Sequence, residues 1–158
     1  MAGYFARQTC LNGHIISNFV AGRADDLTQP FCSKCSAPTI INCPSCGKPQ
    51  HGSLADVISS DRKPDNYCWN CGKPYPWTEK RLQAAEELIR EDELLNAEDK
   101  AQLTATLPEM TSENPRTTLA ATRFKRIIKK MGAALGEAVQ KTMVDIASET
   151  AKKIILGK

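Results

Sequence analysis

The chain has 158 residues, of which 25% are charged and 6% are aromatic, as in an ordinary soluble protein. No uncharged apolar run approaches the roughly 18 residues that a membrane-spanning helix needs. The first residues also lack the apolar centre of a secretory signal. The composition therefore argues against a helical membrane protein, and we expect a cytoplasmic protein in which thiols stay reduced.

All seven cysteines lie between residues 10 and 71. Six of them form three Cys-x-x-Cys pairs, and the seventh is followed four positions later by a histidine. The eight residues are Cys10, His14, Cys32, Cys35, Cys43, Cys46, Cys68 and Cys71. Eight such ligands are enough for two tetrahedral sites, and close cysteine pairs in a reducing compartment indicate metal ligands rather than disulfides. We predict two structural Zn²⁺ ions, with iron as the less favoured metal.

The order of the pairs leaves two arrangements open. In a sequential arrangement, the first two pairs bind one ion and the last two bind the other, so that each site is a zinc ribbon. In a cross-braced arrangement, the first pair joins the third and the second joins the fourth. We favour the sequential arrangement because the second and third Cys-x-x-Cys pairs share the motif Cys-x-x-Cys-Gly-Lys-Pro, as the two halves of one ribbon would.

A degenerate copy of that motif begins at Cys32 and has Ser36 where the other copies have glycine. The residue after the second cysteine of such a turn often needs a positive φ, which glycine adopts at low cost. We expect short strands at 15–20, 39–41 and 54–58 and a polar loop at 59–66.

The formal net charge of +3 treats the thiols as neutral. Seven thiolates and two Zn²⁺ ions would bring the total close to zero. A strong general attraction to nucleic acid or to an anionic membrane is therefore not expected.

The cysteine-rich part also contains a second histidine, several aromatic residues and several lysines that the two predicted metal sites do not use. We interpret His51 as a surface histidine in a turn, because no ninth ligand is required. Aromatic residues gather around the last cysteine pair, and we interpret them as a small core that fastens one ribbon to the other: Tyr67, Trp69, Tyr75 and Trp77. The alternative is that they stack on nucleic-acid bases while nearby lysines contact phosphate: Lys34, Lys48 and Lys73.

The cysteine-rich module ends near Pro74–Thr78, where two prolines interrupt regular structure and Thr78 is a candidate helix N-cap. Apolar residues then recur at helical spacing over 79–95 and, after a cap at Asn96, over 97–107 before Pro108. A single long helix is expected from about 119 to 156, with Gly132 and Gly136 as places for a bend or a close contact.

Charge in this second half is divided unevenly. Residues 79–113 carry ten acidic and four basic side chains, whereas residues 114–158 carry ten basic and three acidic ones. Our main interpretation is that the two parts attract each other when the helices pack. The alternative is that the basic residues at 123–130 contact an acidic partner or a phosphate backbone.

The motifs at 10–14, 31–35, 39–40, 43–46 and 67–78, taken together, resemble a bacterial family of zinc-ribbon proteins that has no assigned function. The resemblance covers residues 10–78 and extends into the helical tail. It implies a bacterial cytoplasmic protein and the same eight metal ligands, and it implies no substrate.

We therefore expect a small α+β protein with a double zinc-ribbon module at 1–78 and a helical interaction domain at 79–158. Nucleophile–base pairs and phosphate-binding glycine loops are absent from the sequence, so we do not expect an enzyme. The leading hypothesis is a non-catalytic adaptor that binds a protein partner or itself through its helices. A nucleic-acid-binding ribbon protein is the second hypothesis, and a cross-braced, RING-like recruiter of a modifying enzyme is the third.

Overall fold

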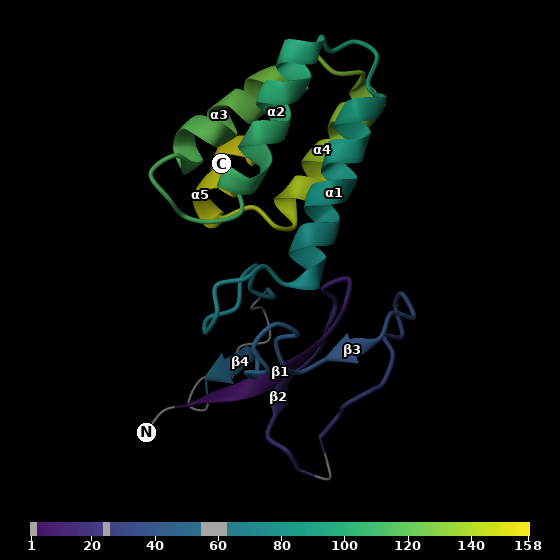
Figure 1. The fold of residues 1–158 in the computed structure, drawn as a ribbon, viewed down its shortest axis with the longest axis vertical. Coiled ribbons are helices and arrows are strands. Elements are labelled where there is room, and N and C mark those ends of the chain that lie inside the picture. Colours follow the sequence, from purple (N-terminus) through teal and green to yellow (C-terminus); the bar gives the residue numbers. More distant parts are fainter. Residues whose placement is uncertain (1–2, 24–25, 55–62) are drawn as a thin grey trace. The chain divides into compact units, whose positions relative to one another are not determined.

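The structure is a computed structural model that describes residues 3–23, 26–54 and 63–158 (Figure 1). The chain divides into two compact units, residues 1–79 and 80–158. The first unit contains the strands and the cysteines, and the second consists of helices. In the described residues, no helix is both long and apolar enough to cross a membrane.

The first unit is built around strand β1 (Tyr4–Cys10), which pairs antiparallel with three others. These are β2 (Ile15–Val20), β3 (Thr39–Ile40) and β4 (His51–Leu54). Strand β3 pairs with the end of β1 and β4 pairs with its beginning. The turn between β1 and β2 contains the Cys-x3-His motif, so the sheet positions the first two candidate ligands directly.

Strand β1 was not expected from the sequence, because its buried residues are polar. Arg7, Gln8 and Thr9 are all at least 95% buried, and each has a hydrogen-bond partner inside the unit. The Arg7 Nε donates to the Asn18 side chain at 2.7 Å, and the Gln8 amide donates to the Gln29 carbonyl at 2.7 Å. A strand whose interior is polar lacks the apolar alternation by which strands are recognised.

The other three strands agree in part with the strands expected from the sequence. The strand at 15–20 is confirmed, and the one at 39–41 ends one residue earlier than expected. Of the expected strand at 54–58, only Leu54 is described, and it ends β4; residues 55–58 lie outside the described residues, as do 59–62 of the expected loop.

The second unit contains five helices, of which the first begins in the first unit. They are α1 (Pro76–Glu91), α2 (Ala97–Glu109), α3 (Thr117–Ile128), α4 (Ala133–Val144) and α5 (Glu149–Leu156). Helix α1 begins at Pro76, because proline suits the first helical position. Thr78 is therefore not the N-cap, and its hydroxyl donates to the Asn66 carbonyl at 2.9 Å. Pro108 lies within the last turn of α2 and does not stop it.

The expectation of one long helix from 119 to 156 is wrong, because α3, α4 and α5 occupy that range. Gly132 caps α4, and its N–H donates to the Asp92 carboxylate at 2.9 Å. Ser148 caps α5, and its own N–H donates to the Met110 carbonyl at 2.8 Å. Each break is thus stabilised by a partner from an earlier part of the chain. The apolar stripe remains continuous because all three helices face one core.

That core is a single cluster that draws on all five helices. Its largest members are fully buried: Ile89, Leu103, Leu107, Met110, Phe124, Ile127, Val139, Met143 and Ile146. Gly136 allows α4 to approach α3, since a Cβ there would lie 3.2 Å from the Ile128 carbonyl oxygen. The core is consistent with a helical unit that needs no metal to fold.

Ion pairs link the acidic part of this unit to its basic part. Lys130 contacts Asp99 at 3.0 Å, Arg116 contacts Glu109 at 2.7 Å, and Arg81 contacts Asp145 at 2.8 Å. The Lys130–Asp99 and Arg116–Glu109 pairs join an acid of residues 79–113 to a base of residues 114–158, as our main interpretation of the charge pattern expects. The Arg81–Asp145 pair also joins the two parts, but with the charges reversed. Such exposed pairs orient the helices and contribute little stability individually.

Asp92 is the buried acid that organises the turn after α1. It is 2% exposed, and its carboxylate accepts the backbone N–H groups of Leu94, Leu95 and Gly132 at 2.8–2.9 Å. Burial alone would raise the pKa of Asp92, but these donors outweigh it and hold the pKa below its ordinary value of 3.8. One side chain therefore ties the end of α1 to the start of α4.

We predict that Asp92→Ala lowers the free energy of unfolding of the helical unit by about 2–3 kcal/mol, since it leaves three backbone donors without their acceptor. Urea unfolding followed by far-UV circular dichroism measures this. The neighbouring Glu93 is exposed, so Glu93→Ala should change stability by less than about 0.5 kcal/mol. Equal effects of the two substitutions would contradict this role of Asp92.

The pH dependence follows from the lowered pKa of Asp92. A carboxylate with a depressed folded-state pKa stabilises the fold fully above its unfolded-state pKa and ceases to do so as the pH falls through the folded-state value. The stability difference between the wild type and Asp92→Ala should therefore be constant near neutral pH and shrink below pH 3.8. A difference that grows on acidification would be inconsistent with this account.

Candidate metal centres

The eight residues singled out in the sequence converge into two groups of four. One group is Cys10, His14, Cys32 and Cys35, and the other is Cys43, Cys46, Cys68 and Cys71. Within each group the ligand atoms all lie within 4.8 Å of one another. The grouping is sequential, and the cross-braced arrangement is not formed.

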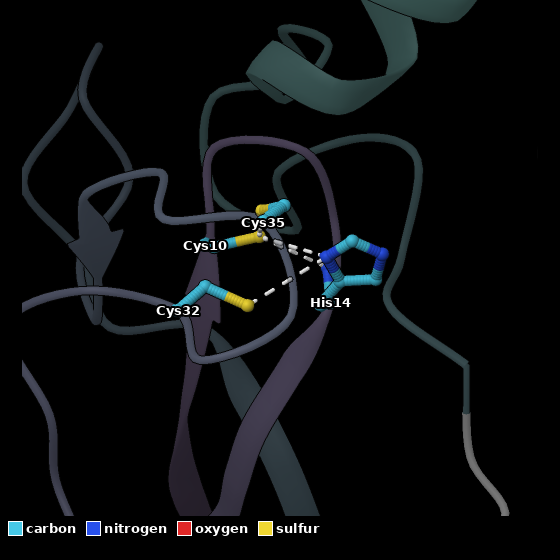
Figure 2. A group of neighbouring side chains, drawn as sticks. All are labelled: Cys10, His14, Cys32 and Cys35. Atoms are coloured by element: carbon cyan, nitrogen blue, oxygen red, sulfur yellow. Dashed lines mark hydrogen bonds between the residues drawn. The ribbon is translucent and has the colours of Figure 1, made fainter.

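We call each Cys-x-x-Cys turn a knuckle. The first group combines the β1–β2 turn with the first knuckle, which contains Cys32 and Cys35, as Figure 2 shows. The His14 Nδ1 faces the sulfurs and lies 3.5 Å from the Cys10 Sγ and 3.7 Å from the Cys32 Sγ. The Cys35 Sγ lies 3.7 Å from the Cys10 Sγ and accepts a hydrogen bond from the Asn12 side chain at 3.4 Å. Nδ1 is therefore the histidine nitrogen placed to bind a metal.

The second group is made by the two knuckles that share the full motif. The Cys43 and Cys71 sulfurs are 3.8 Å apart, and the Cys46 and Cys68 sulfurs are 3.6 Å apart. The backbone N–H of Asn70 donates to the Cys68 Sγ at 3.4 Å. Both sulfur–sulfur contacts cross between the knuckles, so a bound ion would join them.

These separations fit a tetrahedral zinc site. With Zn–S bonds of about 2.3 Å and Zn–N bonds of about 2.05 Å, a regular tetrahedron has S–S edges of about 3.8 Å and S–N edges of about 3.6 Å. The S–S contacts are 3.6–3.8 Å and the S–N contacts are 3.5–3.7 Å. A disulfide would need sulfurs about 2.05 Å apart, and all seven cysteines are free. Both groups therefore suit a tetrahedral metal ion.

Thiol pKa values in the second group show what a cation would do there. Burial raises the pKa of Cys68, but the N–H groups of Cys71 and Asn70 outweigh it and lower that pKa to about 6. At Cys71, the N–H of Lys73 lowers the pKa, but burial and the neighbouring thiols outweigh it and raise the pKa to about 11. One thiolate thus suppresses ionisation of its neighbour, and a divalent cation would remove that repulsion.

All three knuckles use the same backbone hydrogen bonds. The N–H of the residue after the second cysteine donates to the carbonyl of the first, with N···O distances of 2.7 Å at Ser36, 2.8 Å at Gly47 and 2.9 Å at Gly72. Each of these residues has a positive φ, which is 59° at Ser36, 78° at Gly47 and 73° at Gly72. The glycines of the motif are explained by this conformation, and Ser36 adopts it at a cost.

Two aromatic residues connect the metal groups. Tyr75 and Trp77 are 2% and 3% exposed, stack with ring centroids 4.6 Å apart, and pack against Cys43 and Cys68. Trp77 also packs against the turn between Cys10 and His14, since a Cβ on Gly13 would lie 3.0 Å from the Trp77 side chain. The interpretation of Tyr75 and Trp77 as a fastening core is confirmed.

The assignment of Trp69 to the same fastening core is wrong, because Trp69 belongs to a separate stack that sequence reasoning missed. His51 lies in β4, so its interpretation as a turn histidine is wrong. Its ring lies between Tyr4, with centroids 4.1 Å apart, and Trp69, with centroids 4.5 Å apart. Trp69 is 51% exposed, and its indole N–H donates to the Pro49 carbonyl at 2.9 Å. The stack needs β1 beside β4, and β1 was not recognisable from the sequence.

We predict that Cys68→Ser lowers the bound metal from two ions to one per chain, because each group is built from its own four ligands. Metal analysis of purified protein measures the ratio. Ser45→Ala is the matched control, since Ser45 is exposed and lies between Cys43 and Cys46 in the chain, and this variant should keep two ions. Loss of both ions from Cys68→Ser would contradict the independence of the groups.

A second prediction concerns the strained Ser36. Ser36→Gly should tighten metal binding at the first group by up to about tenfold, because glycine adopts the positive φ without steric cost. The converse substitution Gly47→Ser should weaken binding at the second group. Competition with a chromophoric chelator measures both affinities, and opposite signs would refute the strain argument.

Neither the curated proteins nor the solved structures contain a match to the chain. A family described as "Uncharacterized protein conserved in bacteria (DUF2321)" matches residues 3–155. Since the match covers both the cysteine-rich unit and the helical unit, the chain belongs to this bacterial family.

Proposed function

We propose that this chain is a non-catalytic zinc protein in which two Zn²⁺ ions fold the first unit and the helical unit binds a protein partner. The observation that carries the zinc part of the proposal is that each metal group supplies four protein ligands at tetrahedral separations. Sulfur-rich sites of this kind prefer zinc to magnesium, calcium or manganese.

The closed ligand sets favour a structural role for the metal. Catalytic zinc sites keep a position open for water or substrate. Here four protein atoms within 4.8 Å of one another complete a tetrahedron in each group. Cys10, Cys32, Cys43 and Cys68 are also at most 3% exposed. The chemistry available at these sites is therefore that of a cross-link between segments of chain.

The small core of the first unit supports the same role. Its apolar cluster contains Tyr75 and Trp77 together with two buried cysteines, Cys43 and Cys68. The cluster holds few side chains, and the candidate ligands are among them. Structural zinc contributes on the order of 10–16 kcal/mol in small zinc-binding peptides, which is enough to fold a unit with so little apolar burial.

A specific observation favours a second candidate function, the binding of single-stranded nucleic acid. Trp69 and Tyr4 are 51% and 46% exposed at the two ends of the stack through His51. Exposed aromatic rings of this kind bind bases by stacking, at about 1–3 kcal/mol per base. The near-neutral charge expected of the metal-bound protein makes this the weaker candidate.

We predict that a strong chelator unfolds the first unit and leaves the helices folded, because the helical core does not depend on the metal groups. Trp77, buried between the two groups, reports on the first unit through near-UV circular dichroism, and the far-UV signal reports on the helices. Restored signal on adding Zn²⁺ is the control. Retention of the tertiary signal after complete metal removal would refute the structural role.

The second candidate makes a different prediction. An oligothymidylate should quench the fluorescence of Trp69, with weaker binding at higher salt. Trp69→Ala should abolish binding, whereas Phe31→Ala, which removes a 59% exposed aromatic from another knuckle, should have little effect. If metal-loaded protein shows no salt-dependent quenching, this function is excluded.

A further inference from the structure

The exposed side of α4 has features of a protein interface. The helix buries Gly136, Val139 and Met143 in the core of the helical unit. On its other side it presents small and charged residues to solvent: Ala133, Ala134, Glu137, Lys141 and Asp145 at its C-cap. Small residues at 133 and 134 would let a second helix approach closely.

An apolar groove runs along the same helix. It has a volume of about 590 Å³ and lies between α4, the end of α3 and the end of α5. Ile128, Met131, Val144 and Leu156 contribute its apolar part. Leu156 is 41% exposed, so an apolar side chain at the rim of the groove faces solvent.

The charges beside the groove are of both signs. Glu137 and Lys141 line it one helical turn apart, and neither has a salt bridge to any residue that the structure describes. Asp145 is already paired with Arg81 at 2.8 Å. Lys129, just after α3, also lines the groove. A partner of one sign, such as nucleic acid or an anionic lipid surface, would be repelled by at least one of these side chains.

On α4 itself, the acid Glu137 and the base Lys141 lie at equal distances along the helix from the level of Val139, so this face of the helix is complementary to itself. A two-fold axis at the level of Val139 would place a second copy of α4 antiparallel to the first. Glu137 would then face Lys141 of the second copy, and Lys141 would face its Glu137. The same rotation sets Ala134 opposite Val144, a small residue against an apolar one. Such isologous contacts are the commonest type in protein oligomers.

We propose that two copies of this chain associate through antiparallel α4 helices, with reciprocal Glu137–Lys141 ion pairs beside the apolar groove. This interface goes beyond the proposed function, because it requires neither a bound metal nor a different protein. A three-turn helix contributes a small area, so the dimer belongs to the weak, concentration-dependent class.

Sedimentation velocity of the full metal-loaded chain over a concentration series tests the proposal. The wild type should show a reversible monomer–dimer equilibrium. Glu137→Lys places lysine opposite lysine twice and should raise the dimer dissociation constant by about tenfold or more. Lys141→Glu should have the same effect. Glu98→Lys, a charge reversal at an exposed position of α2, should leave the constant unchanged.

Mixing the two single variants distinguishes an interface from an effect within one helix. A mixed dimer of Glu137→Lys with Lys141→Glu has opposite charges at both contacts, so the mixture should associate about as well as the wild type although each variant alone does not. Far-UV circular dichroism checks that both variants are folded. A wild type that stays monomeric at the highest soluble concentration overturns the proposal, as does a mixture no better associated than its components.

Discussion

The contact between sulfurs from segments distant in sequence is the interaction on which the first unit depends. Cys10 meets Cys35, Cys43 meets Cys71, and Cys46 meets Cys68, each across more than twenty residues of chain. The N–H of Lys73 lowers the pKa of Cys71, but burial and the other thiols of its group outweigh it and raise that pKa to about 11, so thiolates within one group repel one another. A divalent cation would convert that repulsion into attraction. The sheet and the two buried aromatic residues, Tyr75 and Trp77, are arranged around these contacts.

The two units are stabilised by different physical means. The first has a small apolar cluster and polar residues inside its central strand, so in our proposal metal cross-links supply the stability that apolar burial does not. The second has an apolar core drawn from all five helices, and a buried acid, Asp92, satisfies the backbone donors where the helices break. This difference explains why metal removal should affect one unit and spare the other.

The features that were predictable from the sequence are those carried by short-range patterns. The eight candidate ligands, the strand at 15–20 and the core role of Trp77 follow from local spacing. The long-range features were not predictable in this way. Strand β1 is held by polar side chains whose partners lie elsewhere, and the stack on His51 exists only because β1 pairs with β4. The helix break at Gly132 depends on Asp92, and the break at Ser148 depends on the Met110 carbonyl. The helical periodicity of the sequence does not reveal either contact.

X-ray absorption spectroscopy of the zinc-loaded protein tests the central claim most directly. The two groups together contain seven sulfurs and one histidine nitrogen. We predict four-coordinate zinc with Zn–S distances of about 2.3 Å and an average of seven sulfur ligands to one nitrogen over the two ions. Zinc with oxygen ligands from water, or with a sulfur share well below this ratio, would contradict the account of two closed structural sites.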